Sequence, residues 1–233
     1  MIGTRSIDSR IIASMLMLCL ASSLVGLEAR ADGQMSVLPN VGTSQRYNAS
    51  HGLPYMGSQD GTLTITRADV TSVHITAGGS LTAFDQTLSV DSSGSIAQVS
   101  PADPFINTLN NLTAILAAAP SSLQPNAQWT LKIQAPSWPS GRRPMSLPKG
   151  FESVPVTVTV TSVSGNVVSL HAEGKDETDM MTIAGNSGTR ESMTVDFQLK
   201  SGLLESCTQT TELAFGMMAS PTTISQSASL TAK

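Results

Sequence analysis

The chain has 233 residues, of which 40% are hydrophobic and only 13% are charged, and its formal net charge is −4. A chain of this length and hydrophobic content is able to bury a core of its own. The negative charge argues against nucleic acid as a partner, because phosphates are bound by clustered Lys and Arg side chains. Ser and Thr supply much of the polarity, which suits strands better than helices.

Residues 1–31 have the pattern of an export signal. Arg5 and Arg10 precede an uncharged apolar stretch at 11–27, and Ala29-Arg30-Ala31 offers the small residues that a signal peptidase requires. We therefore expect cleavage after Ala31 and a location in the bacterial periplasm or outside the cell. The apolar stretch is at the lower limit for crossing a bilayer, so an uncleaved anchor is the alternative.

Cleavage at this site changes the charge and the cysteine content. It removes three basic and two acidic residues from the 13 and 17 of the whole chain, which leaves a net charge of −5. Cys207 is the one cysteine that remains. The mature protein is therefore expected to fold without an internal disulfide, which a chain of about 200 residues is able to do.

The remaining chain divides at about residue 61. Residues 32–61 are rich in Gly, Ser, Asn and Gln and lack a sustained period, which predicts an irregular leader. Residues 62–233 are predicted to form a single β-rich domain. Short segments around His74 and His171 are similar to each other and are compatible with a weak duplication of 62–119 in 127–230, although ordinary hairpin patterns explain them as well.

Alternating apolar and polar residues predict most of the strands of this domain. The alternation is found at 62–66, 73–76, 129–133, 154–160, 168–172, 193–199, 203–215 and 222–230, and Asp91-Ser-Ser-Gly94 predicts a turn between two short strands. The connections are too short for parallel crossovers, so the sheet is predicted to be antiparallel. The alternation also predicts that one face of the sheet is wet.

A single amphipathic helix is predicted at 103–119. Asp103 and Pro104 suit the N-cap and the first helical position, Pro120 ends the pattern, and four apolar residues follow at helical spacing: Phe105, Leu109, Leu112 and Leu116. We therefore predict a mainly β fold, an antiparallel curved sheet, open barrel or half-barrel with this helix on its apolar face. The helix either fills the core or covers a cavity beside Val156, Val158 and Val195.

The residues able to do chemistry are few and scattered. His171 and Glu173 share a strand face, as a base and its orienting carboxylate would, but the face is the polar one and a solvated pair is the favoured interpretation. Zinc normally requires three or four converging ligands. Cys207 shares a face with apolar residues, which predicts a buried apolar role rather than a reactive thiolate. We therefore predict no catalytic residue, no cofactor site and no metal site.

An acidic segment follows His171. Its four carboxylates lack the alternating oxygen spacing and the turn glycine of a calcium loop, which predicts a solvated turn formed by Glu173, Asp176, Glu177 and Asp179.

The loop at 136–148 is the predicted binding element. It joins Trp138, Arg142 and Arg143 to several prolines in a chain that is otherwise poor in aromatic and basic residues. The alternative is that Trp138 packs on the sheet and the arginines only keep the loop soluble. The expected function is that of an exported, soluble, non-enzymatic binding or envelope-associated module. Its expected partner is a protein or envelope component, or an apolar small molecule; the alternatives are a hydrolase of unknown class and a carrier of an apolar small molecule.

Overall fold

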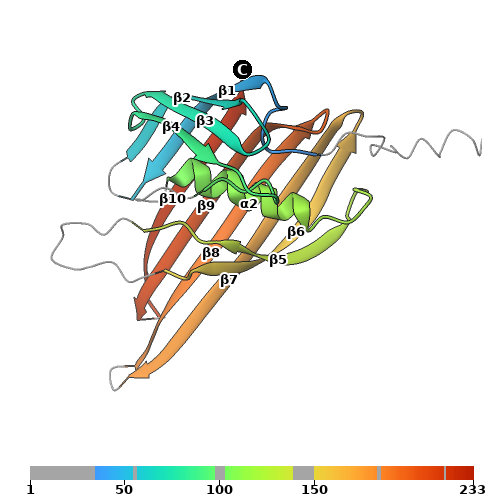
Figure 1. Cartoon of the computed structure of the whole chain (residues 1–233). Coiled ribbons are helices and arrows are strands. Elements are labelled where there is room, and N and C mark those ends of the chain that lie inside the picture. The colour runs from blue at the N-terminus through green and yellow to red at the C-terminus, as the bar shows by residue number, and fades with distance from the viewer. Residues whose placement is uncertain (1–34, 55–56, 98–102, 139–149, 183–184, 218) are drawn as a thin grey trace, which may run out of the picture.

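The computed structural model describes residues 35–54, 57–97, 103–138, 150–182, 185–217 and 219–233, and it does not describe the side chains of 179–186. The described residues form one open antiparallel sheet of ten strands with one helix laid across it (Figure 1). The predicted fold class is therefore confirmed. Within the described residues, no helix combines the length and hydrophobicity that a membrane crossing requires.

Two meanders of strands build the sheet. Their elements are β1 (Thr43–Leu53), β2 (Gly57–Arg67), β3 (Ser72–Gly79), β4 (Phe84–Ser89), α2 (Pro104–Ala117), β5 (Gln128–Gln134), β6 (Ser153–Ser164), β7 (Val167–Thr182), β8 (Gly185–Lys200), β9 (Leu203–Met217) and β10 (Thr222–Ala232). The strand order is β4-β3-β2-β1-β10-β9-β8-β7-β6-β5. Pairing of β1 with β10 therefore joins the first meander to the last strand of the second.

The prediction of an irregular leader at 32–61 was wrong where β1 and the first part of β2 lie. Tyr47 and Ala49 are buried at alternate positions of β1, and β1 is hydrogen-bonded to β2 on one side and to β10 on the other. The outward positions of β1 carry polar residues, and its inward positions include few large apolar ones. Pairing with two neighbours, rather than hydrophobicity, makes this segment a strand.

The acidic segment is also not a turn. Glu173, Asp176 and Glu177 lie within β7 and pair with Thr194, Glu191 and Arg190 of β8. The β7-β8 pairing continues to Thr182 opposite Gly185, so these strands form a long hairpin that extends past α2 (Figure 1). The alternation of apolar and polar residues ends at about residue 172. The residues that follow are mostly polar, so alternation did not predict the rest of the strand.

The helix prediction is confirmed at its N-terminus. Asp103 is the N-cap, its side chain accepts hydrogen bonds from the backbone N–H groups of Phe105 and Ile106, and Pro104 is the first helical residue. The helix ends at Ala117. The predicted apolar face is buried at Phe105, Leu109 and Leu112 and half-buried at Leu116, and the predicted sheet partners Val156, Val158 and Val195 are buried as well. On this face α2 fills the core.

Amide side chains also fasten α2 to the sheet. Asn111 donates to the backbone carbonyl of Gln134 (2.9 Å) and to Oε1 of Gln209 (3.0 Å), and it accepts from the backbone N–H of Gln134 (2.9 Å). Gln209 donates in turn to Oδ1 of Asn107 (2.9 Å). Asn107, Asn111 and Gln209 are all buried, so their mutual hydrogen bonds compensate the loss of water.

Candidate functional site

Trp138 contacts a buried carboxylate. Its indole Nε1–H donates to Oε1 of Glu191 at 2.8 Å, and the backbone N–H of Phe151 donates to the other carboxylate oxygen at 2.6 Å. Glu191 is 0% exposed, and burial raises its pKa while the two hydrogen bonds oppose that shift. Trp138 is half-buried, and Arg142 and Arg143 lie outside the described residues. The binding role of these three residues stays a prediction.

His171 lies on the outer face of the sheet between two carboxylates. Its Nδ1 lies 2.7 Å from Oδ1 of Asp196, and its Nε2 lies 3.5 Å from Oε2 of Glu173. The hydrogen bond to Asp196 is the main reason that the pKa of His171 is raised. The strand-face relation of His171 and Glu173 is therefore as predicted, but Asp196 is the closer partner. The sequence missed it because the register of β7 and β8 places it opposite His171.

Cys207 packs as an apolar residue, as the sequence predicts. It is 3% exposed, and burial raises its pKa to about 12. At neutral pH its sulfur is therefore a thiol, which is a poor nucleophile and a poor metal ligand.

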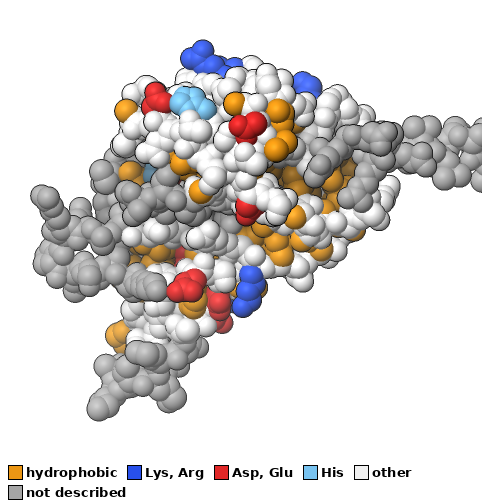
Figure 2. All heavy atoms as spheres, viewed as in Figure 1, with side chains coloured by type: hydrophobic (Ala, Val, Ile, Leu, Met, Phe, Trp, Pro, Cys, Tyr) orange, Lys and Arg blue, Asp and Glu red, His pale blue; other side chains and the backbone are white. Residues whose placement is uncertain are grey.

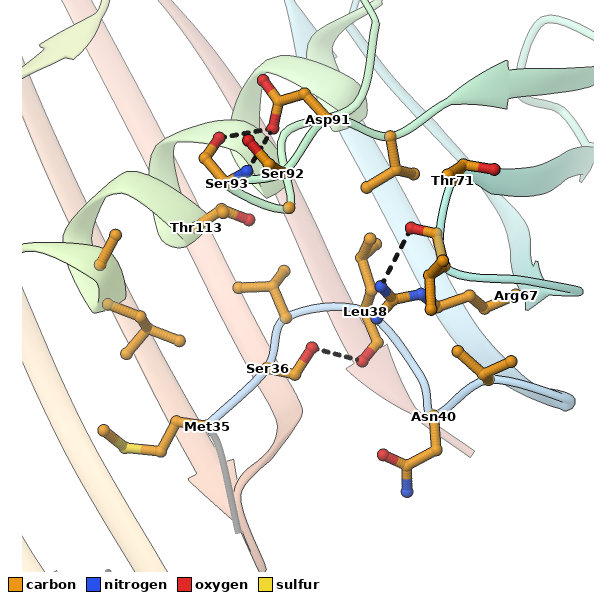
Figure 3. Close-up of a pocket in the computed structure, with 17 residues that line it drawn as sticks. Met35, Ser36, Leu38, Asn40, Arg67, Thr71, Asp91, Ser92, Ser93 and Thr113 are labelled. Carbon is orange, nitrogen blue, oxygen red and sulfur yellow. Dashed lines mark hydrogen bonds between the residues drawn. The ribbon is translucent and has the colours of Figure 1, made fainter. Parts of the chain in front are cut away.

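The structure contains a pocket beyond the C-terminal half of α2, which the sequence did not predict. Its volume is about 1040 Å³, at the upper end of the range for small-molecule sites. Four segments supply its walls (Figure 3). They are residues 35–38 with 40–41, Arg67 at the end of β2 with residues 70–71 that follow the strand, residues 90–94, and Thr113, Leu116 and Ala117 of α2. These segments are far apart in the sequence, so only the fold brings them together.

Hydrogen bonds hold two of the pocket walls in place. Ser36 donates its backbone N–H to the carbonyl of Gly202 (2.9 Å), which fixes the N-terminal segment on the β8-β9 turn. Asn110 of α2 accepts from the backbone N–H of Ile96 (2.7 Å) and donates to its carbonyl (2.8 Å). The second pair fastens the 90–96 hairpin, whose turn was predicted, to the helix. Both walls are therefore held in place by hydrogen bonds within the protein.

The lining of the pocket includes one cation, Arg67, and one carboxylate, Asp91. Asp91 Oδ1 accepts from the backbone N–H groups of Ser93 (2.8 Å) and Ser95 (3.0 Å) and from the Ser93 hydroxyl, which lowers the pKa of Asp91. Arg67 donates from Nη2 to the Val70 carbonyl at a long 3.5 Å. One carboxylate oxygen of Asp91 is thus occupied by donors of its own turn, whereas the guanidinium of Arg67 has one long hydrogen bond within the described residues.

Three buried side-chain nitrogens of the described residues have no hydrogen-bond partner: His51 Nε2, Arg67 Nε and Gln226 Nε2. The ring of His51 packs edge-on against Phe105 with centroids 6.0 Å apart, and burial lowers the pKa of His51. Of the three nitrogens, that of Arg67 belongs to a residue that lines the pocket. Among the described residues, Arg67 is therefore the pocket residue whose buried side-chain nitrogen lacks a partner.

The described residues contain no group of three or more His, Cys, Asp or Glu side chains arranged to hold a metal ion. Compared with protein-family models, with curated proteins and with solved structures, the chain matches none of them.

Proposed function

We propose that this chain is an exported, non-enzymatic binding module that holds a small molecule in the pocket bounded by residues 35–41, 67–71, 90–94 and the end of α2. The observation that carries the proposal is the pocket itself, about 1040 Å³ in volume and lined by apolar, hydroxyl and charged side chains. Small-molecule sites combine apolar walls with a few polar groups in this way. The predicted export signal at 1–31, which lies outside the described residues, is the reason for proposing that the protein is exported.

The described chemical groups favour binding over hydrolysis. A histidine that acts as general base needs a free ring nitrogen that is able to take a proton from the nucleophile. Both ring nitrogens of His171 face carboxylates, and the Cys207 thiol is buried with a raised pKa. Neither residue is placed for nucleophilic catalysis, so a hydrolase would need a site built from other residues.

The test is to fill the pocket with a side chain. Ala117 is exposed and lines the pocket, whereas its neighbour Ala118 is exposed and lies outside the lining. We expect native mass spectrometry of the chain purified from its own host to show a bound small molecule. The Ala117→Trp variant should lose this mass because the indole occupies the ligand's volume, and the Ala118→Trp variant should keep it.

Three outcomes would contradict the proposal. The first is a wild-type chain that carries no small molecule and that also shows no thermal shift with a panel of alkyl and aromatic compounds. The second is turnover of ester, peptide or glycoside substrates that the His171→Ala variant loses, which would indicate a hydrolase. The third is retention of the ligand by Ala117→Trp, which would show that the ligand binds elsewhere on the molecule.

A further inference from the structure

Arg67 occupies a position on β2 where the pattern calls for an apolar residue. Leu63 and Ile65 are buried at alternate positions, and Arg67 is the next position on the same face of the strand. Its side chain therefore points to the core side of the sheet and not to the solvated outer face. Figure 3 shows the guanidinium reaching from the end of β2 toward Leu38 at the pocket.

The guanidinium of Arg67 lacks adequate partners. Within the described residues, its one hydrogen bond is the 3.5 Å contact with the Val70 carbonyl, and its Nε is buried without a partner. None of the described carboxylates forms an ion pair with it. A half-buried cation in this state is costly, because the water it has lost is not replaced by acceptors.

Among the described residues, Asp91 forms no ion pair with Arg67. Although it lines the same pocket, Asp91 directs its Oδ1 to the donors of its own turn. The pocket therefore offers an incoming ligand one unpaired cation whose planar donors suit a carboxylate or phosphate. In a chain with a net negative charge, such a cation is also the feature that would allow an anion to bind here.

Apolar side chains also line the pocket. Met35 lies on the opposite side of the pocket from Arg67 (Figure 3), and Leu116 and Ala117 at the end of α2 are further apolar residues of the lining. Val41 and Val70 line the pocket beside Arg67, since the Val70 carbonyl accepts from Arg67 and the N–H of Gly42 donates to the Arg67 carbonyl. They are 49% and 64% exposed, and they are two of the three large hydrophobic side chains that are exposed among the described residues. Apolar side chains left in water around a pocket are typical of a binding surface.

Figure 2 is seen from the side of the sheet that carries α2, and it shows hydrophobic side chains gathered on one flank of the visible face. Leu116, Trp129 and Leu131 are half-buried apolar residues that pack against the core. The apolar lining of the pocket thus adjoins the core of the protein, and an alkyl chain there has apolar neighbours.

We infer that the pocket binds a single-chain anionic amphiphile, with a carboxylate or phosphate head on Arg67 and an alkyl chain directed toward Met35 and Leu116. This inference rests on the proposed function and names the ligand class of the same pocket. Arg67 is a binding residue that supplies the head-group contact, and the apolar walls supply contact area for the chain.

The experiment compares an anionic probe with a neutral one of the same shape. Fluorescence titration with dansylaminoundecanoate and with its methyl ester is carried out on the wild type, Arg67→Gln, Arg67→Lys and Arg46→Gln. Arg46 is an exposed residue of β1 that alternates with buried Tyr47, so Arg46→Gln makes the same charge change on the outer face. Circular dichroism checks that each variant is folded.

We expect the wild type to bind the acid about tenfold more tightly than the ester, which is the lower end of what a charge-assisted hydrogen bond contributes. Arg67→Gln should weaken binding of the acid about tenfold and leave the ester unchanged. Arg67→Lys should retain part of the preference, and Arg46→Gln should retain all of it. Dodecyl phosphate should displace the acid, whereas inorganic phosphate should not.

Each contrary result has a separate meaning. Equal wild-type affinity for acid and ester overturns the role of Arg67 while the proposed binding function stands, and this comparison needs no variant. Displacement by inorganic phosphate alone indicates a small-anion site and overturns the amphiphile. Failure to bind either probe, with an empty native mass, overturns the proposed function as well.

Discussion

At the residue scale, the contact of Trp138 with Glu191 joins the end of the described 103–138 segment to the middle of β8. The carboxylate is fully buried, so it depends on the indole N–H and the Phe151 N–H to replace water. Loss of one donor to a buried charge costs more than loss of a donor to a neutral carbonyl. Trp129 provides the neutral comparison, because its Nε1–H donates to the Ile115 carbonyl at 3.2 Å.

We predict that Trp138→Phe lowers the free energy of unfolding by about 2 kcal/mol at pH 7 and by less at pH 4. Since the pKa of Glu191 is raised in the folded state, the native protein binds this proton more readily than the unfolded chain. The stability that Glu191 contributes therefore falls as the pH rises from 4.5 through its folded pKa. Removal of the indole donor raises that pKa further, so the fall becomes larger and extends to higher pH.

Urea unfolding followed by circular dichroism at the two pH values measures this difference. Trp129→Phe is the control, with an expected loss of about 1 kcal/mol at both values, because its acceptor is not ionised. Equal losses for Trp138→Phe at pH 4 and pH 7 would show that packing, and not the hydrogen bond to the carboxylate, is what the indole supplies.

At the element scale, β6 and β7 approach closely where Pro155 interrupts the pairing. The β6-β7 ladder begins at Val156 opposite Gly174, so Pro155 lies at an irregularity, as its missing N–H predicts. A Cβ on Gly174 would collide with the carbonyl oxygen of Pro155 and would lie 2.8 Å from Cα of Val156. Both of these atoms are backbone atoms and are unable to rotate away.

We therefore predict that Gly174→Ala lowers the free energy of unfolding by about 2 kcal/mol or more, as expected for overpacking against backbone. Gly78→Ala on β3 is the matched control, since its Cβ would meet no atom within 4 Å. We expect that control to change stability by no more than about 0.5 kcal/mol in either direction. Chemical denaturation of the two variants provides the comparison, and equal effects would rule out the steric explanation.

The edge strand β5 shows how the helix supports the sheet. The backbone of Gln134 on β5 exchanges hydrogen bonds with the Asn111 side chain, and Trp129 on the same strand donates to the last turns of α2. Edge strands present unpaired backbone groups that invite pairing with another chain. In this protein, α2 covers part of that edge and so limits pairing of β5 with another chain.

At the scale of the whole molecule, the two meanders share one sheet and one core. The core cluster includes Ile65 and Val73 of the first meander and Val195 and Leu230 of the second. The β1-β10 pairing connects strands that are about as far apart in the chain as its length allows. Loss of either meander would therefore expose core residues of the other.

We predict that urea unfolding is a single cooperative transition. The two tryptophans, Trp129 and Trp138, report on the segment around β5, whereas far-UV circular dichroism reports on all ten strands. The midpoints from fluorescence and from circular dichroism should coincide. A circular dichroism transition that begins at lower urea than the fluorescence transition would show that β1 to β4 unfold independently.

Much of the fold was determined by the sequence itself. Alternation predicted β5, β6, β9 and β10, and Asp103 with Pro104 predicted the start of α2, because these signals depend on near neighbours in the chain. The buried setting of Cys207 followed from the same alternation. Local periodicity and capping act over a few residues, so a single sequence carries them in readable form.

The rest was decided by tertiary contacts. β1 and the far part of β7 are strands because neighbouring strands pair with them, although their own residues are largely polar. Asp196 reaches His171, and Glu191 reaches Trp138, only through strand register and chain folding. The pocket gathers four distant segments around Arg67. The segments that form the pocket are separated by long stretches of chain. No local sequence pattern encodes which of these segments will meet.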